Sequence, residues 1–186
     1  MLILINGASS SGKTSLARSL QKLWSGPLLY WSLDHLISQL PFSYTGSGEH
    51  SADGFETVDS DIYVRQHGYV LNDLSVAYIA SLANAGYDVV IDYVLIDQQV
   101  LMPFVERLHN HEVCFVGLTC DERVISDRNT SRVDRVPGLS LQQQSKVHFC
   151  RSFYDLELDS SKALPEELAS QLFAFIANES ISRGVS

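Results

Sequence analysis

The sequence predicts an α/β fold in which helices cover both faces of a parallel sheet. Short apolar runs of strand length alternate with helix-length segments along the chain, which is typical of a parallel sheet with right-handed crossovers. Apolar residues make up 45% of the 186 residues and charged residues 19%, enough for a buried core in one domain. A Gly- and Ser-rich loop joins the first apolar run to the first helical segment.

The expected strands are short runs that are apolar or alternate in polarity. They comprise residues 2–6, 28–32, 88–92, 113–119 and 154–158. The first run is too short for the apolar part of a signal peptide and lacks a basic flank, so we interpret it as a buried strand. No run of about 18 apolar residues is present, so we expect no membrane span and a cytoplasmic location.

Helical segments fill the intervals between these strands. They comprise residues 13–24, 62–85, 98–109, 122–131, 141–151 and 166–177. Gly86 ends the long helix before the third strand. The last helix begins at Pro165, with Glu166 and Glu167 in its first turn, where the helix dipole favours acidic side chains.

We expect a single domain over residues 1–186, with a substrate flap at about 41–60 and an arginine-bearing lid at about 121–138. The flap segment breaks the alternation, is rich in Gly, Ser and Thr, and is long for a plain connection; disorder without function is the alternative. The net charge of −9 argues against nucleic acid or an anionic membrane as the main partner.

Residues 7–14 match the phosphate-binding pattern GxxxxGK[ST], between an apolar strand and an amphipathic helix. The backbone amides of such a loop point at phosphate oxygens, and the new helix offers its positive end. Lys13 would reach the β- and γ-phosphates of ATP, and the Thr14 hydroxyl would ligate Mg²⁺. The predicted ATP-binding residues of this loop are Gly7, Ala8, Ser9, Ser10, Ser11, Gly12, Lys13 and Thr14.

Two acids follow the second and third expected strands. Ligands of open α/β sheets bind beyond the carboxyl ends of the strands, so Asp34 and Asp92 should both project toward Lys13. Asp92 has the position of an acid that holds Mg²⁺ directly or through water. For Asp34 the residues alone favour two interpretations equally: a general base, or the N-cap of a short helix.

A cluster of arginines follows the fourth expected strand. Arg128 and Arg132 are i, i+4 neighbours on one helix face, and Arg135 lies in the turn that follows. An arginine-bearing lid would stabilise charge on a transferred phosphoryl group, with Arg128 assigned to ATP binding. The alternative is pairing with acids of the same helix, but stacked like charges are unfavourable without an anion.

Together these motifs resemble the chloramphenicol phosphotransferase-like family of P-loop kinases, over almost the whole chain and in order. The matching segments are residues 7–14, 31–37, 90–92, 116–120, 122–135, 147–148 and 154–160. The resemblance implies an adenylate-kinase-like core with strand order 2-3-1-4-5. It also implies an ATP-dependent phosphotransferase with an alcohol group as acceptor, with Asp34 in the position of the family's proposed general base.

The sequence departs from the family pattern at two positions. Tyr93 stands where the family often has a second acid, on the acceptor or metal side, which weakens the case for chloramphenicol itself as substrate. Val133 replaces a glycine of the arginine segment, which affects the stiffness of the lid hinge and leaves the chemistry unchanged.

The expected reaction is in-line transfer of the γ-phosphate of Mg-ATP to a hydroxyl of a small molecule. Asp34 would accept or orient the acceptor's proton, while Lys13, Mg²⁺, Arg132 and Arg135 would neutralise the developing charge. The acidic flap favours neutral or cationic acceptors. Two alternatives remain open: a nucleoside or nucleotide kinase, and a nucleotide-binding regulator without catalysis.

Overall fold

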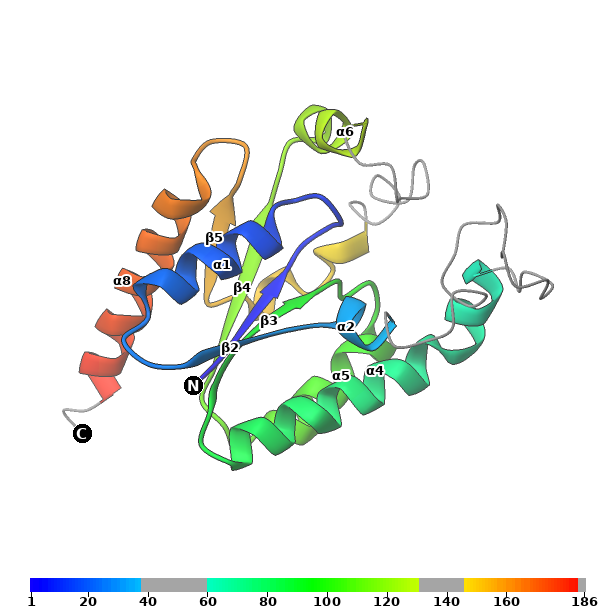
Figure 1. Ribbon diagram of the computed structural model, residues 1–186, viewed down its shortest axis with the longest axis horizontal. Coiled ribbons are helices and arrows are strands. Elements are labelled where there is room, and N and C mark those ends of the chain that lie inside the picture. Colours follow the sequence, from blue (N-terminus) through cyan, green and yellow to red (C-terminus); the bar gives the residue numbers. More distant parts are fainter. Residues whose placement is uncertain (38–59, 131–145, 184–186) are drawn as a thin grey trace.

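The computed structural model describes residues 1–37, 60–130 and 146–183. Within them a parallel sheet has the strand order β2-β3-β1-β4-β5 (Figure 1), which confirms the expected fold class and strand order. The strands are β1 (Leu2–Asn6), β2 (Leu28–Ser32), β3 (Asp88–Tyr93), β4 (Val113–Thr119) and β5 (Leu156–Asp159).

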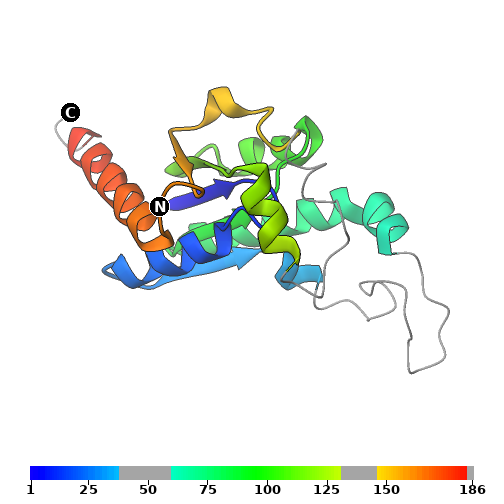
Figure 2. The same ribbon diagram turned by 90° about the horizontal axis from the view of Figure 1, so that it is seen from above.

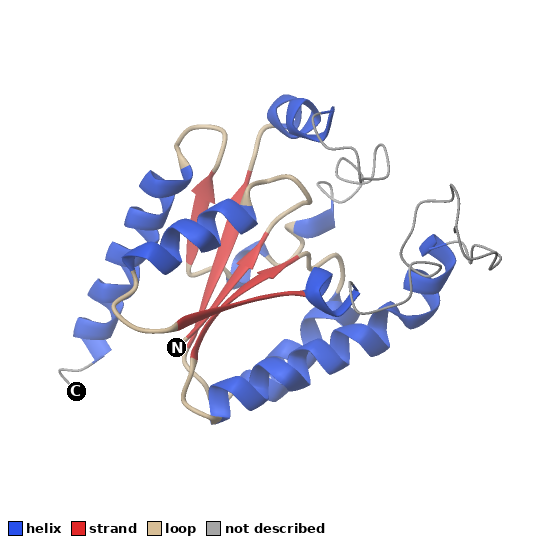
Figure 3. Ribbon diagram, in the orientation of Figure 1, coloured by secondary structure: helices blue, strands red, loops and turns tan. Residues whose placement is uncertain are grey.

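Two layers of helices enclose this sheet (Figure 3). Its two faces are covered by α1 (Lys13–Leu23) with α8 (Pro165–Arg183), and by α4 (Ser60–Asn84) with α5 (Gln98–Leu108). The remaining helices are α2 (Leu33–Ile37), α6 (Glu122–Thr130) and the 3-10 helix η1 (Arg151–Phe153). Viewed from above, α6 crosses over the carboxyl end of the sheet, close to the start of α1 (Figure 2).

The pleat of β1 divides the core into two parts. Ile3 and Ile5 point toward α1 and α8, whereas Leu2 and Leu4 pack with residues of α4 and α5. A strand buried on both faces is apolar throughout, as the sequence of β1 is. The same alternation along β3 puts Val90 on the α1 face, and Tyr93 on the α4 face.

The segment from residue 146 to residue 158 differs from the expected one. Residues 141–145 lie outside the described residues, and after residue 147 the chain forms turns and η1 instead of a helix to residue 151. The fifth strand begins at Leu156, two residues later than expected. Among the described residues, no helix combines the length and apolar character that crossing a membrane requires.

Candidate active site

The conformation of the loop between β1 and α1 depends on two glycines, Gly7 and Gly12. A Cβ at Gly7 would lie 2.6 Å from the Leu118 carbonyl oxygen, so the backbone of the loop can approach β4 only without a side chain there. Gly12 has a φ of 100°, in the left-handed region that glycine adopts without strain. Gly12 caps α1 without a side-chain hydrogen bond, which leaves first-turn amides facing the loop.

Three side chains meet at the end of this loop. The Thr14 hydroxyl donates a hydrogen bond to Oδ2 of Asp92 at 2.6 Å. The Lys13 ammonium donates to the Ala8 carbonyl at 2.8 Å and lies 3.6 Å from Oδ1 of Asp92. Both Lys13 and Asp92 are buried, so their opposite charges interact with little screening by solvent. Lys13, Thr14 and Asp92 thus form one contiguous polar cluster.

Tyr30 of β2 adds a fourth group to this cluster, and it is not among the site residues predicted from the sequence. Its hydroxyl donates to Oδ2 of Asp92 at 3.0 Å. Burial, and next the negative charge of Asp92, raise the pKa of Tyr30, so its hydroxyl keeps its proton and acts as the donor. The alternation of side chains along β2 could have indicated this contact. Tyr30 lies on the same face of the strand as Ser32, and Ser32 pairs in register with Asp92.

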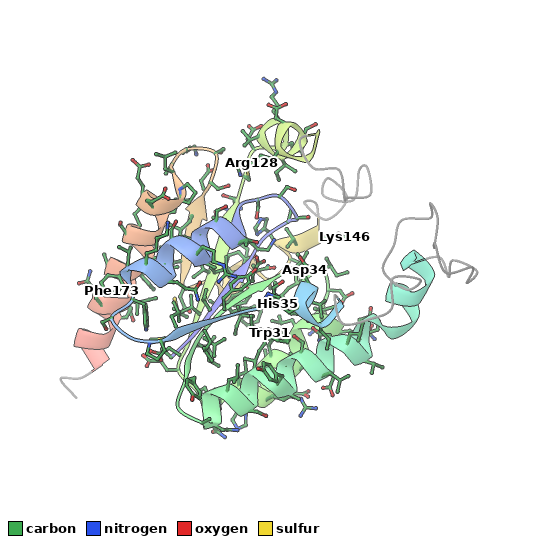
Figure 4. The ribbon with its side chains drawn as sticks, in the orientation of Figure 1. Trp31, Asp34, His35, Arg128, Lys146 and Phe173 are labelled. Atoms are coloured by element: carbon green, nitrogen blue, oxygen red, sulfur yellow. The ribbon has the colours of Figure 1, made fainter. Side chains whose placement is uncertain are left out.

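Arg128 of α6 reaches down to the phosphate loop from above (Figure 4). Its guanidinium donates to the carbonyls of Ser11 at 3.3 Å and Ser160 at 3.1 Å. The Ser160 hydroxyl in turn donates to the Ser11 carbonyl at 2.5 Å. Beside these contacts lies an open pocket of about 250 Å³, bordered by Gly12, Arg128 and Ser160 together with the start of α8.

Asp34 lies on α2, at the carboxyl edge of the sheet (Figure 4). The Ser32 hydroxyl accepts a hydrogen bond from the Asp34 backbone N–H at 3.1 Å, so Ser32 is the N-cap of this short helix. The N-cap interpretation of Asp34 is therefore wrong. The carboxylate of Asp34 is exposed and, within the described part of the chain, it has no hydrogen-bond or ion-pair partner.

The structure explains why Tyr93 can replace an acid. Its side chain is buried on the α4 face of the sheet, where its hydroxyl donates to Oδ1 of Asn72 at 2.7 Å. The Asn72 amide donates to the Val100 carbonyl, so this polar pair is satisfied without a charge. Burial raises the pKa of Tyr93, which keeps its hydroxyl neutral.

The other predicted site residues lie outside the described part of the chain. These are Arg132 and Arg135 of the lid, with residues 131–138, and the flap up to residue 59. The described lid residues are those of α6 and the turn before it, and they place Arg128 on the phosphate loop. The described part of the predicted site therefore comprises residues 7–14, Asp34, Asp92 and Arg128.

The residues present fit a bound magnesium nucleotide. The described residues contain no cluster of three or more His, Cys, Asp or Glu that could hold a metal. Mg²⁺ in kinase sites, however, takes only one or two protein groups and otherwise phosphate oxygens and water. Thr14 and Asp92 provide such groups. Among the described residues the buried Ser11 hydroxyl has no hydrogen-bond partner, as expected for a group that faces a phosphate.

Residues 1–177 match the family model described as chloramphenicol phosphotransferase-like protein. The chain belongs to this family. Two strains of Mycobacterium tuberculosis each have a protein that is related to this chain and is named "Putative O-phosphotransferase". Each is 30% identical over 187 residues, covering 92% of this chain and 80% of the relative.

Solved structures of kinases share the fold of this chain. A sugar kinase from Janibacter sp. has a TM-score of 0.65 at 18% identity, covering 95% of this chain and 94% of its own. The Mycobacterium tuberculosis APS kinase in complex with AMPPNP and APS has a TM-score of 0.64 at 15% identity, covering 95% and 96%. At these identities the likeness shows the P-loop kinase fold.

Proposed function

We propose that this protein transfers the γ-phosphate of ATP to a hydroxyl group of a small molecule. The observation that carries the proposal is the direct contact of Asp92 with both Thr14 and Lys13 at the phosphate loop. A hydroxyl, a carboxylate and a lysine at this point are the groups that hold Mg²⁺ and the β- and γ-phosphates in P-loop enzymes. Family membership and the kinase fold support the same activity.

The nucleoside part of ATP would lie in the open pocket beside the loop. This pocket continues from Gly12 past Arg128 to the turn after β5, so a nucleotide whose phosphates fill the loop would extend into it. The Arg128 guanidinium borders this pocket, and its N–H groups donate to the Ser11 and Ser160 carbonyls. Arg128 therefore belongs to ATP binding in this proposal.

The reaction would proceed in line. The acceptor oxygen forms a bond to the γ-phosphorus as the bond from that phosphorus to the bridging oxygen of ADP breaks, and Asp34 takes the acceptor's proton. Lys13 stabilises negative charge on the β- and γ-phosphate oxygens, and Arg132 and Arg135 act on the same charge from the lid. Mg²⁺, when bound by Thr14 and Asp92, supplies further neutralisation of these oxygens.

The acceptor class follows from the family and the charge of the chain. The curated relatives carry the name of O-phosphotransferases, which fits a hydroxyl acceptor. The acidic sequence of the flap favours a neutral or cationic acceptor, and the net charge of −9 disfavours nucleic acid or an anionic membrane as partner. We propose the cytoplasm as the compartment, where ATP and Mg²⁺ are available.

The test is a screen of hydroxyl compounds for acceptor-dependent release of ADP. It would include neutral antibiotics with primary hydroxyls, aminoalcohols, sugars and nucleosides, so that a nucleoside kinase would also be found. The Lys13→Met variant should lose all turnover, because it removes the ammonium and keeps the aliphatic chain. Lys22→Met, at the other end of α1, is the matched control and should remain active. Tight ATP binding without stimulation by any acceptor would contradict the proposal and indicate a nucleotide-binding regulator.

A further inference from the structure

The contact between Tyr30 and Asp92 reaches beyond the residues that a phosphate loop requires. Oδ2 of Asp92 accepts two hydrogen bonds at once, from the Thr14 hydroxyl at 2.6 Å and from the Tyr30 hydroxyl at 3.0 Å. Oδ1 of the same carboxylate faces the Lys13 ammonium at 3.6 Å. Each oxygen of Asp92 thus faces a different neighbour, and the carboxylate plane has a defined orientation.

The ring of Tyr30 is itself held in place from two sides. The Arg18 guanidinium lies over its face, 4.2 Å from the ring centroid, and His35 contacts it edge-on with a centroid separation of 5.3 Å. Cation–π and edge-to-face contacts of this kind favour one position of the ring. The position of the Tyr30 hydroxyl therefore depends on α1 through Arg18 and on α2 through His35.

The position of His35 links this arrangement to the acceptor side. His35 follows Asp34 directly on α2, and both lie at the carboxyl edge of the sheet (Figure 4). Tyr30 is consequently in contact with the acid beside Thr14 and with the short helix that carries Asp34. The contacts of Tyr30 therefore join these two parts of the site.

We propose that Tyr30 is a positioning residue that orients Asp92 for the magnesium of the bound nucleotide. This inference rests on the proposed function. Hydrogen bonds that hold a metal-binding carboxylate in place commonly affect metal affinity by 10- to 100-fold. Without the Tyr30 hydroxyl, Asp92 keeps its contacts with Thr14 and Lys13 but loses the second hydrogen bond to Oδ2, so the carboxylate is oriented less firmly.

The experiment measures ADP binding by calorimetry with Mg²⁺ and with EDTA, for the wild-type protein and the Tyr30→Phe variant. Tyr30→Phe removes the hydroxyl and keeps the ring on which Arg18 and His35 rest. We expect the affinity for ADP in EDTA to be unchanged. The gain in affinity that Mg²⁺ provides should fall by about 10-fold.

The matched control is Tyr93→Phe, which removes the hydroxyl that faces Asn72 on the opposite side of the sheet. It should lower the melting temperature and leave the Mg²⁺-dependent gain at the wild-type value. An unchanged gain in Tyr30→Phe, whatever its melting temperature, would overturn the inference alone. If the wild-type protein bound no ADP in Mg²⁺, the proposed function would fail, and the inference with it.

Discussion

The Ser32 hydroxyl accepts a hydrogen bond from the Asp34 backbone N–H at 3.1 Å, so Ser32 caps α2. The Asp34 carboxylate is exposed at the edge of the sheet. The two residues therefore have separable roles. Ser32 stabilises a helix of five residues, whereas the charge of Asp34 is available to an acceptor molecule. A comparison of variants at these two positions can test this division directly.

Asp34→Asn should lower kcat by roughly 10²–10⁴-fold on the true acceptor, because it removes the proposed general base and keeps the shape of the side chain. Its melting temperature should match that of the wild-type protein, since within the described residues the carboxylate contacts no partner that its loss would expose. Steady-state kinetics and thermal unfolding measure the two quantities. An Asn variant with the wild-type kcat would remove Asp34 from the mechanism.

Ser32→Ala serves as the complementary variant. Loss of the capping hydroxyl should lower the free energy of unfolding by about 1 kcal/mol. Denaturant unfolding of Ser32→Ala and Asp34→Asn, measured side by side, should therefore show a shifted midpoint for the Ser variant alone.

Arg128→Ala should act mainly on ATP binding. The guanidinium donates to two carbonyls at the edge of the pocket proposed for the nucleotide, and loss of a hydrogen bond to a charged group costs about 1.5 kcal/mol or more. We expect KM for ATP to rise roughly ten-fold with little change in kcat, which is the pattern of lost ground-state binding. Arg123→Ala, an exposed arginine of the same helix, is the control. A fall in kcat at constant KM would instead place Arg128 at the transferred phosphoryl group.

Arg132 and Arg135 should show the opposite kinetic pattern. An arginine that closes over the γ-phosphate acts on charge that develops in the transition state, so its loss lowers kcat more than it raises KM for ATP. For the arginine that contacts the phosphoryl group we expect a loss of roughly 10³-fold. Arg132→Ala and Arg135→Ala, assayed separately with saturating ATP, identify which one it is. Wild-type kinetics in both variants would contradict a catalytic role for Arg132 and Arg135 and leave them as surface charges.

Local sequence patterns were sufficient for most of the fold. The bounds of β1, β2 and β4 agree with the expected strands, because each is a short run of strand length that is rich in apolar residues. The phosphate loop could be predicted because its spacing reflects backbone geometry. Asp92 could be placed near Lys13 because parallel strands bring their carboxyl ends to one edge.

The remainder depended on contacts between residues far apart in sequence. The helix expected to extend to residue 151 ends earlier because the Val147 carbonyl accepts from the Asn6 amide at 2.7 Å, and Arg151 bonds back to His148. The Asn6 amide also donates to the Tyr154 hydroxyl, at 2.8 Å, and Tyr154 precedes the delayed fifth strand. No local pattern in residues 141–158 contains the information that residue 6 is a partner.

Gly117 illustrates the same limit. A Cβ at this position would lie 2.1 Å from the ring of Tyr154, so the ring can pack on β4 only against a glycine. In the sequence both residues belong to segments that resemble the family, but the sequence gives no physical reason for a glycine at 117 or a tyrosine at 154. The structure shows that the glycine makes room for the tyrosine ring.

His148 provides a prediction about pH. Its Nδ1 lies 2.8 Å from the Tyr154 hydroxyl. The same hydroxyl accepts a hydrogen bond from the side chain of Asn6, the residue just before the phosphate loop. Burial lowers the pKa of His148; Glu157 opposes this shift and Arg151 adds to it. Below about pH 6.5 the unfolded chain binds a proton at this histidine that the folded protein does not yet bind. The free energy of unfolding should therefore decrease as the pH falls below that value.

Melting temperatures across this pH range test the assignment to His148. His148→Asn keeps an acceptor for the Tyr154 hydroxyl and cannot take up a proton, so its melting temperature should depend less on pH than that of the wild-type protein. His109→Asn, at an exposed histidine after α5, is the matched control and should keep the wild-type dependence. If His148→Asn kept the wild-type slope as well, the pH dependence would arise from other groups. A reduced slope in His148→Asn alone would show that the neutral imidazole stabilises the segment that packs behind the phosphate loop.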